Sequence, residues 1–242
     1  MNPLTEKTPH SERIIISLGG SLIVPDGIDW EFLRSFKGFI EAELERERRF
    51  IIVSGGGKTC RLYVEAASKA ASVSEEDQDW IGIHATRLNA HLLRTILRDH
   101  AYPRINTNPH DLEDFYVADD PVLIAAGWRP GFSTDYDAAL LGKYLDVDRI
   151  INLSNIDYVY DKDPRKHEDA KKFERLSWSE FRKLVGEEWT PAMNAPFDPI
   201  ASKLAEEEGM EVAVLSGHDL GNVSRYIAGE PFVGTVIAND KS

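Results

Sequence analysis

The sequence contains very little cysteine, because Cys60 is the only one among 242 residues. A single cysteine excludes an internal disulfide and a cysteine metal cluster, so we expect a reducing, cytoplasmic environment. Long hydrophobic runs are also missing, and no stretch approaches the roughly 18 continuous apolar residues of a membrane-spanning helix. The first 12 residues are polar and lack the apolar core of a secretory signal. We expect them to be a flexible N-terminus.

Positive charge is scarce as well. The chain has 28 basic and 41 acidic side chains, for a net charge of −13, which argues against a general nucleic-acid binder. A small anionic ligand remains compatible with this charge, because it feels only the field of its own pocket. The histidines show no metal-ligand spacing, so we expect no protein metal site. With 42% hydrophobic residues, the chain is long and apolar enough to bury a sizeable core.

Short β-branched, apolar segments alternate with segments of helical period. Strands are expected at residues 13–18, 50–53, 122–125, 149–153, 211–215 and 233–237. Helices are expected at residues 29–49, 58–71, 75–100, 135–145, 178–185 and 199–208. This alternation requires crossover connections and predicts an α/β fold with a mostly parallel sheet covered on both faces. Residues 158–196 are irregular and are expected to form a lid or a hairpin.

Two glycine clusters, at residues 19–20 and 55–57, follow predicted strands and precede predicted helices. Glycine lets the backbone approach a phosphate closely, so that N–H groups supply positive charge. The alternative for each cluster is a tight left-handed corner without a ligand. The P-loop motif fails because Ile52 occupies the position of its first glycine, and the first cluster does not match G-x-G-x-x-G. An anion site without either motif is therefore predicted.

Two further polar turns follow predicted strands. In residues 130–135, Ser133 or Thr134 is able to cap the next helix and bind an anion there, or to act as a plain cap. Residues 154–164 offer carboxylates, aromatic rings and a lysine, which suit a base, a ribose and phosphates. A solvated charged loop is the alternative for that segment. No G-x-S-x-G elbow is present, and Cys60 has no context that marks it as a nucleophile.

The order of these motifs resembles the amino acid kinase superfamily, and in particular the archaeal-type UMP kinases. The resemblance runs from about residue 13 to residue 237 and includes an especially typical D-x-x-G-x-x-A-T-R-x-N block. The motifs are I-S-L-G-G-S (16–21), S-G-G-G-K-x-x-R (54–61), D-W-I-G-I-H-A-T-R-L-N-A (79–90), P-G-F-S-T-D (130–135), N-I-D-Y-V-Y-D-K-D-P (155–164), F-D-P-I-A-S-K (197–203) and G-T-V-I (234–237).

The resemblance implies one domain over residues 13–242, a three-layer α/β/α sandwich around a mainly parallel sheet. Its N-terminal half, to about residue 145, would bind the acceptor, and its C-terminal half would bind ATP. The reaction implied is transfer of the ATP γ-phosphoryl group to UMP with Mg²⁺. The partners implied are small nucleotides and copies of the same chain, in a homohexamer of dimers that pack through the second and third helices, with no nucleic acid and no membrane.

The resemblance also implies site residues. Those assigned to phosphoryl transfer are Gly20, Ser21, Arg61, Asp135 and Lys203. Those assigned to UMP are Gly56, Asp79, which would bind the ribose hydroxyls, and the turn Trp128, Arg129, Pro130, Gly131, Phe132, Ser133 and Thr134. Those assigned to ATP are Gly20, Ser21, Gly57, Arg61, Ser154, Asn155, Tyr160 and Asp163.

Three positions depart from the family pattern. Ser17 stands where many relatives carry lysine, and Trp128 and Arg129 replace smaller residues in the acceptor turn. Tyr158 replaces a glycine, so it is expected to strain the loop if that glycine has positive φ, or to fill part of the ATP site. Two alternatives therefore stay open: a non-catalytic nucleotide or oxyanion binder like the molybdenum-storage proteins, and a kinase for another small phosphate or carboxylate.

Overall fold

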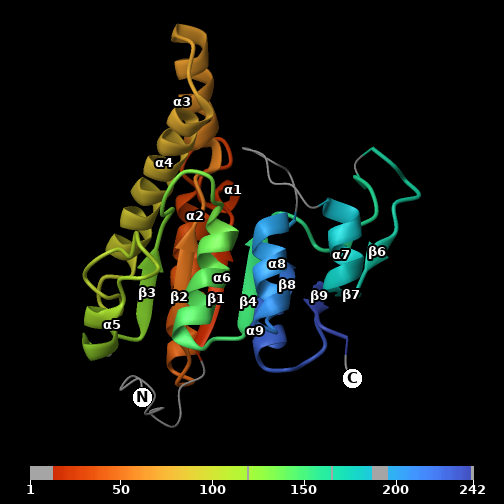
Figure 1. Cartoon of the computed structure of the whole chain (residues 1–242). Coiled ribbons are helices and arrows are strands. Elements are labelled where there is room, and N and C mark those ends of the chain that lie inside the picture. The colour runs from red at the N-terminus through yellow and green to blue at the C-terminus, as the bar shows by residue number, and fades with distance from the viewer. Residues whose placement is uncertain (1–12, 119, 165, 187–195, 241–242) are drawn as a thin grey trace.

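The computed structural model describes residues 13–118, 120–164, 166–186 and 196–240 (Figure 1). The expected flexible N-terminus, residues 1–12, lies outside the described residues, and so does the 187–195 part of the irregular region. One seven-stranded sheet runs through the molecule, with helices on both of its faces. The expected α/β sandwich is confirmed, and its seven-stranded sheet contains strands from both halves of the chain.

The sheet has the strand order β3-β2-β1-β4-β8-β9-β7. The strands in that order are β3 (Val122–Ala125), β2 (Arg49–Ser54), β1 (Arg13–Leu18), β4 (Arg149–Ser154), β8 (Glu211–Ser216), β9 (Thr235–Ala238) and β7 (Arg175–Ser177). The first five are mutually parallel, whereas β9 runs antiparallel to β8, and β7 pairs in parallel with β9. The carboxyl ends of five strands therefore meet at one edge, which is the edge where ligands bind in parallel sheets.

The central strand β1 explains the two layers of helices. Ile14 and Ile16 belong to one buried cluster, whereas Ile15 belongs to another, because successive side chains point to opposite faces of the sheet. The first face is covered by α1 (Gly20–Ile23), α2 (Trp30–Leu44), α4 (Glu75–Ile96) and α9 (Leu220–Ile227). The second is covered by α6 (Thr134–Leu145), α7 (Trp178–Val185) and α8 (Pro199–Glu207).

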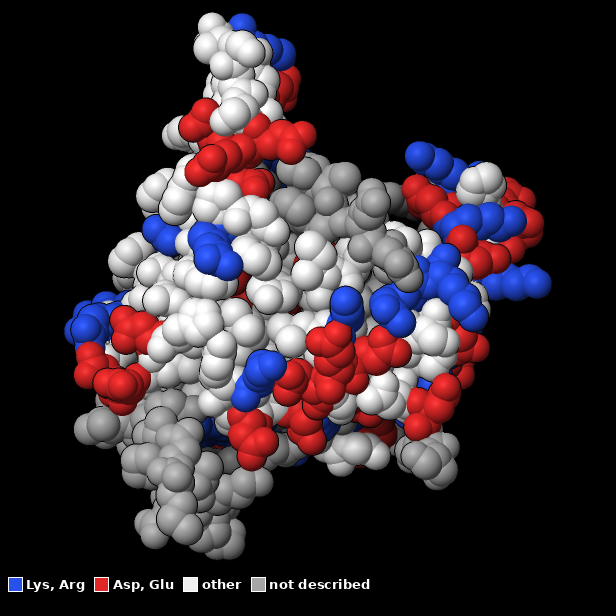
Figure 2. All heavy atoms as spheres, viewed as in Figure 1, with Lys and Arg blue, Asp and Glu red and all other residues white. Residues whose placement is uncertain are grey.

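Helix α3 (Gly57–Ala70) and the start of α4 project beyond the body of the molecule (Figure 1). No residue of α3 is buried, and its side chains Leu62 and Tyr63 are 51% and 67% exposed. Acidic side chains gather where this projection meets the body (Figure 2), consistent with Glu75 and Glu76 in the first turn of α4. The projection is thus a helical pair with exposed apolar side chains and an acidic base.

Several boundaries differ from the sequence prediction. Helix α2 ends at Leu44 instead of residue 49, because the chain turns through a left-handed residue, Glu47, and enters β2 at Arg49. Helix α4 ends at Ile96 instead of residue 100, and α8 ends one residue earlier than predicted, at Glu207. The last strand starts two residues later than predicted, at Thr235.

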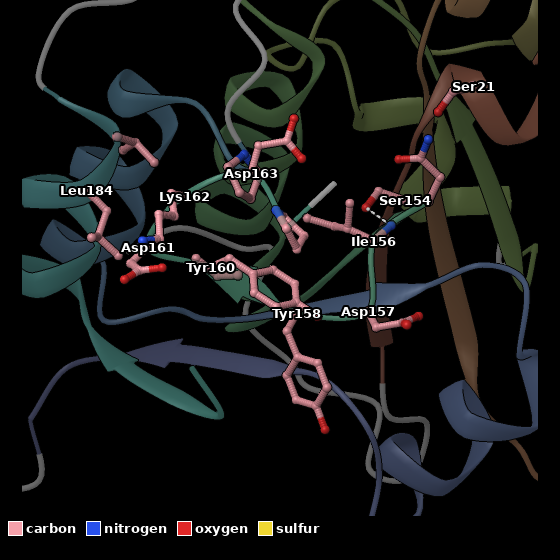
Figure 3. A pocket seen from close by; sticks show the side chains of 15 residues that line it. Ser21, Ser154, Ile156, Asp157, Tyr158, Tyr160, Asp161, Lys162, Asp163 and Leu184 are labelled. Carbon is pink, nitrogen blue, oxygen red and sulfur yellow. Dashed lines mark hydrogen bonds between the residues drawn. The ribbon is translucent and has the colours of Figure 1, made fainter. Parts of the chain in front are cut away.

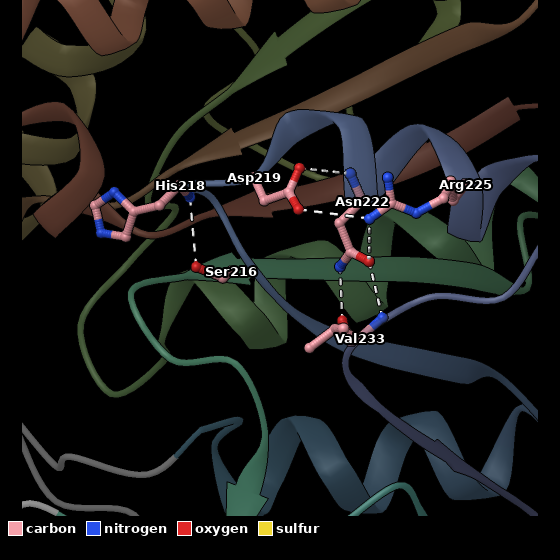
Figure 4. A network of polar contacts seen from close by, with 6 residues as sticks. All are labelled: Ser216, His218, Asp219, Asn222, Arg225 and Val233. Atoms are coloured by element: carbon pink, nitrogen blue, oxygen red, sulfur yellow. Dashed lines mark hydrogen bonds and ion pairs between the residues drawn. The ribbon is translucent and has the colours of Figure 1, made fainter.

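Three short helices and one strand at the sheet edge were not predicted: α1, α5 (Glu113–Ala118), α9 and β7. Polar side chains fix helix α9 in addition to its buried apolar residues Val223, Tyr226 and Ile227 (Figure 4). Asp219 caps its first turn, and Asn222 donates to the carbonyl of Val233 at 2.6 Å and accepts from its N–H at 2.8 Å. Hydrogen bonds of this kind, between residues of separate segments, produce no periodic pattern in the sequence.

The irregular region contains the hairpin that was expected of it. Strand β5 (Val159–Tyr160) pairs antiparallel with β6 (Lys172–Phe173), so the expectation of a hairpin is confirmed for the described residues. No helix among the described residues is long and apolar enough to cross a membrane.

Candidate active site

The two glycine clusters meet backbone to backbone. Strands β1 and β2 run in parallel register and end side by side, with Leu18 opposite Ser54. A Cβ atom on Gly20 would lie 2.0 Å from the nitrogen of Gly57, and one on Gly57 would lie 2.3 Å from the carbonyl oxygen of Gly20. Gly57 also has a φ of +63°, which disfavours other residues. We call this contact of residues 19–20 with 55–57 the glycine junction.

The glycine junction accounts for glycine at these positions by packing alone, and it also places the start of a helix at the end of β2. Helix α3 starts at the junction, and its N-cap, Gly56, provides no side-chain hydrogen bond. The N–H of Lys58 donates to the carbonyl of Val24 at 3.0 Å, and first-turn N–H groups that lack such a partner suit an anion. The tight corner and the anion site, treated as alternatives from the sequence, are therefore compatible in one structure.

Helix α4 fixes the glycine junction in place. Its buried side chain Asn89 donates from Nδ2 to the carbonyl oxygens of Gly55 at 2.8 Å and Gly56 at 3.2 Å. The Gly56 carbonyl also accepts from the N–H of Cys60 at 3.4 Å, and the Gly55 carbonyl from the hydroxyl of Ser54 at 3.4 Å, so Asn89 provides the shorter hydrogen bond to each. Asn89 is the last polar residue of the D-x-x-G-x-x-A-T-R-x-N block, so this end of the block has a positioning role that the sequence analysis did not assign.

Two other residues of the block bind the backbone at the start of the acceptor turn, which is the turn over residues 128–134 assigned to UMP from the sequence. The hydroxyl of Thr86 accepts from the N–H of Gly127 at 2.9 Å. Arg87 donates to the carbonyl of Gly127 at 3.2 Å and to that of Trp128 at 3.0 Å. Sequence reasoning missed both roles. The available signal was a polar Thr-Arg pair followed by an asparagine on a helix whose neighbouring residues are apolar.

A hollow of about 810 Å³ lies beyond the carboxyl end of β4 (Figure 3). We call it the donor pocket. The structure brings together at its wall five of the residues assigned to ATP: Ser21, Ser154, Asn155, Tyr160 and Asp163. The hairpin strand β5 and the side chains Leu184 and Val185 of α7 close it on the far side.

Tyr158 stands in the wall of the donor pocket without backbone strain. Among the described residues, the only non-glycine positions with positive φ are Glu47 and Asp146. The Tyr158 hydroxyl points away from Ser21 (Figure 3), and Lys172 lies 4.3 Å from the ring centroid and donates to the hydroxyl at 3.2 Å. The expected strain is therefore absent.

A second, open groove of about 710 Å³ lies between the start of α4 and the polar turn after β3. We call it the acceptor groove. It is lined by Glu75, Glu76, Asp79, Trp80, Arg129, Pro130, Gly131 and Phe132. The N–H of Gly131 donates to Asp79 at 2.8 Å, and the Arg129 guanidinium lies over the rings of Trp128 at 4.0 Å and Phe132 at 4.9 Å.

The remaining predicted residues occupy different places. Ser133 caps α6 by accepting from the N–H of Tyr136, and its hydroxyl donates to Asp198, while Thr134 begins that helix. The side chains of Arg61 on α3 and Lys203 on α8 are exposed. Neither Arg61 nor Lys203 lines the donor pocket or the acceptor groove.

Asp135 sits under the site at the start of α6. Its carboxylate accepts from the hydroxyl of Ser17 at 2.7 Å and from the amide of Asn152 at 3.1 Å. Burial, together with the neighbouring charge of Asp198, raises the pKa of Asp135 to about 7. Ser17, the residue that replaces the lysine of many relatives, thus provides a hydroxyl donor to this carboxylate.

No group of three or more His, Cys, Asp or Glu side chains within the described part of the chain is arranged to hold a metal ion. Mg²⁺ commonly binds through substrate phosphates, one or two carboxylates and water. The donor set here, with its few carboxylates, fits an ion that arrives with a nucleotide better than a resident metal centre.

Replacement of Gly20 by alanine tests the glycine junction. Gly20→Ala is expected to lower the midpoint of urea unfolding strongly, by the equivalent of about 1–3 kcal/mol or more, because backbone atoms cannot yield to the added Cβ. Gly38→Ala is the matched control, since a Cβ at this exposed position in α2 meets nothing within 4 Å. Equal midpoints for the two variants would contradict the close backbone contact.

Replacement of Asp135 by asparagine tests its raised pKa. The folded protein binds this proton more tightly than the unfolded chain, so wild-type stability should fall as pH rises from about 4 to about 7. Asp135→Asn removes this contribution. The melting temperature of the variant relative to wild type should therefore be higher at about pH 8 than at about pH 5. A difference that does not change with pH would contradict the assignment.

Comparison with known proteins agrees with this geometry. Residues 12–216 match the model of the Amino acid kinase family. A curated uridylate kinase of Pyrococcus abyssi is 34% identical over 224 residues, which cover 90% of this chain and 96% of that protein. One of Thermoplasma volcanium is 36% identical over 228 residues, which cover 94% and 98%.

Solved structures agree as well. The crystal structure of uridylate kinase from Archaeoglobus fulgidus matches with a TM-score of 0.80 and 33% identity, covering 93% of this chain and 99% of that one. An aspartate kinase from Synechocystis, at 16% identity and a TM-score of 0.72, shares the fold alone. On the family match, the archaeal relatives and the common fold, the chain belongs to the amino acid kinase family.

Proposed function

We propose that this chain is a uridylate kinase, which transfers the γ-phosphoryl group of ATP to UMP and releases UDP and ADP. The observation that carries the proposal is its similarity, over about nine-tenths of its length, to curated uridylate kinases. The geometry supports it, because the donor pocket and the acceptor groove provide separate places for two nucleotides.

The chemistry requires positioning and charge stabilisation more than a covalent nucleophile. An oxygen of the UMP phosphate attacks the γ-phosphorus in line, the bond to the β–γ bridging oxygen breaks, and ADP leaves with that electron pair. Charge then spreads over the oxygens of the transferring group. The backbone N–H groups of the glycine junction and the guanidinium of Arg61 would stabilise it. Mg²⁺ bound to the ATP phosphates would supply further neutralisation.

ATP is assigned to the donor pocket. Ser21 extends from the glycine junction into this pocket and would lie beside the phosphates. Ser154, Asn155, Tyr160 and Asp163 would hold the adenosine end. Support comes from their shared position at the carboxyl end of β4, where parallel sheets bind ligands.

UMP is assigned to the acceptor groove. The Asp79 carboxylate accepts hydrogen bonds and therefore suits the two ribose hydroxyls. Thr134, together with the glycine junction, would bind the UMP phosphate. The rings of Trp128 and Phe132, with Arg129 over them, form one side of this turn.

The assembly is proposed to be a homohexamer of dimers that pack through α3 and α4. Support comes from apolar side chains on these projecting helices, since Leu62 and Tyr63 on α3 and Leu88 on α4 are each more than half exposed. Exposed apolar side chains grouped on neighbouring helices commonly mark an interface.

Turnover with a panel of monophosphates tests the function. The protein is incubated with ATP, Mg²⁺ and UMP, CMP, AMP or GMP, and ADP release is followed. UMP should give the fastest turnover. Tight binding of ATP or of a metal oxyanion, without turnover of any monophosphate, would instead favour the non-catalytic binder, an alternative that the uridylate kinase relatives do not favour.

Replacement of Asp79 by asparagine tests the acceptor assignment. Asp79→Asn should raise KM for UMP about tenfold or more and leave KM for ATP nearly unchanged, because a carboxylate hydrogen bond to the ribose is weakened. Glu76→Gln is the matched control, since it removes one negative charge from the same helix and groove. If both KM values rise equally in Asp79→Asn, or if the control gives the same effect, the acceptor site has been placed wrongly.

A further inference from the structure

The peptide groups of Gly127 and Trp128 are held from every side. Thr86 accepts from the Gly127 N–H, and Arg87 donates to both carbonyl oxygens. The remaining group, the N–H of Trp128, donates to Oδ2 of Asp137 at 3.1 Å. All four backbone polar groups of this dipeptide therefore have side-chain partners, three of them from α4 and one from α6.

Asp137 is an unusual residue for its place. It lies in the first turn of α6, is only 1% exposed, and its Oδ1 atom is buried with no hydrogen-bond partner among the described residues. Burial of a carboxyl with an unsatisfied oxygen is costly. An apolar side chain of similar size would fill the same space without that cost. Acceptance from the Trp128 N–H is the one hydrogen bond between this carboxyl and the rest of the described chain outside its own helix.

The position of Trp128 also determines the position of the acceptor turn. Its ring stacks on Phe132 with centroids 5.8 Å apart, and His110 packs edge-on against it at 5.1 Å. The Arg129 guanidinium lies 4.0 Å from the same ring. A shift of the Trp128 peptide would therefore move its ring, and with it the Phe132 ring and the Arg129 guanidinium, which line the acceptor groove.

We propose that Asp137 is a positioning residue for acceptor binding, which holds the Trp128 peptide, and with it the turn over residues 128–132, in the shape that receives the acceptor nucleotide. This inference rests on the proposed function, because the acceptor groove is assigned to UMP there. Asp137 lines neither the donor pocket nor the acceptor groove, so it acts through Trp128.

The charges around Asp137 indicate how its protonation affects binding of the acceptor nucleotide. Asp135, on the same helix, and Asp198, before α8, are negative neighbours, and Arg87 of α4 is the positive one. Burial is the largest effect, and it raises the pKa of Asp137 to about 7. The hydrogen bond from the Trp128 N–H and the charge of Arg87 act in the opposite direction and lower the pKa. Both forms of the carboxyl accept that hydrogen bond, but ionisation above about pH 7 adds a negative charge beside two other carboxyls and opposes the approach of a phosphate.

Two variants separate positioning from folding. Asp137→Val fills the buried space but cannot accept a hydrogen bond, so KM for UMP should rise about fivefold to tenfold while kcat and KM for ATP stay within about twofold. Asp137→Asn keeps a neutral acceptor oxygen and should restore KM for UMP to near the wild-type value. Unchanged KM for UMP in Asp137→Val, or no rescue by Asn, would overturn the proposal.

A control variant addresses general loss of stability. Leu145→Ala removes buried volume at the other end of α6, away from the acceptor turn. It should lower the melting temperature without changing KM for UMP. If Leu145→Ala raises KM for UMP as much as Asp137→Val does, the effect is loss of stability and the positioning role is wrong.

If Asp137→Val does not fold, the pH dependence of KM for UMP tests the positioning role of Asp137. KM for UMP should rise in the wild type as pH goes from about 6.5 to about 8.5, and it should rise less in Asp137→Asn. Identical pH profiles would overturn the proposal. A wild type that phosphorylates no monophosphate would instead refute the proposed function. In that case amide hydrogen exchange over residues 127–132 still tests whether Asp137 holds the Trp128 peptide. Exchange there should be faster in Asp137→Val than in Asp137→Asn.

Discussion

The close backbone contact between the two glycine clusters is the constraint on which the site depends. Gly20 and Gly57 approach so closely that neither position has room for a Cβ atom. The contact is possible because β1 and β2 are adjacent parallel strands that end in register. It brings two loop-to-helix turns to one point of the sheet edge. Ser21, which directly follows the junction, lines the donor pocket.

Helix α4 holds the acceptor side of this arrangement. Asn89 binds the glycine carbonyls, while Thr86 and Arg87 bind the backbone of the acceptor turn. These bonds are made to backbone groups of the loops that follow β2 and β3, and they fix the positions of those loops. The family block D-x-x-G-x-x-A-T-R-x-N is therefore, over most of its polar positions, a means of placing loops. Asp137 adds one further bond, to the N–H of Trp128, from the opposite layer of helices.

Much of the fold was predictable because its segments are locally consistent. The buried strands β1, β2, β3, β4 and β8 are short β-branched runs, and the long helices have regular apolar periods. The short helices α1, α5 and α9 were missed because contacts with distant residues stabilise them. The antiparallel direction of β9 was also missed, since the direction of a strand depends on the path of the chain between strands and not on the strand's composition.

The sequence by itself determined the class of fold, the strand ends that carry ligand-binding turns and, through ordered motifs, the resemblance to UMP kinases. Each of these depends on neighbours along the chain. Only the tertiary structure decided that Tyr158 fits the donor-pocket wall without strain, and that Asp137 supports Trp128. Backbone dihedral angles, burial and bonds between separate helices decide these points. They arise only when distant segments pack together.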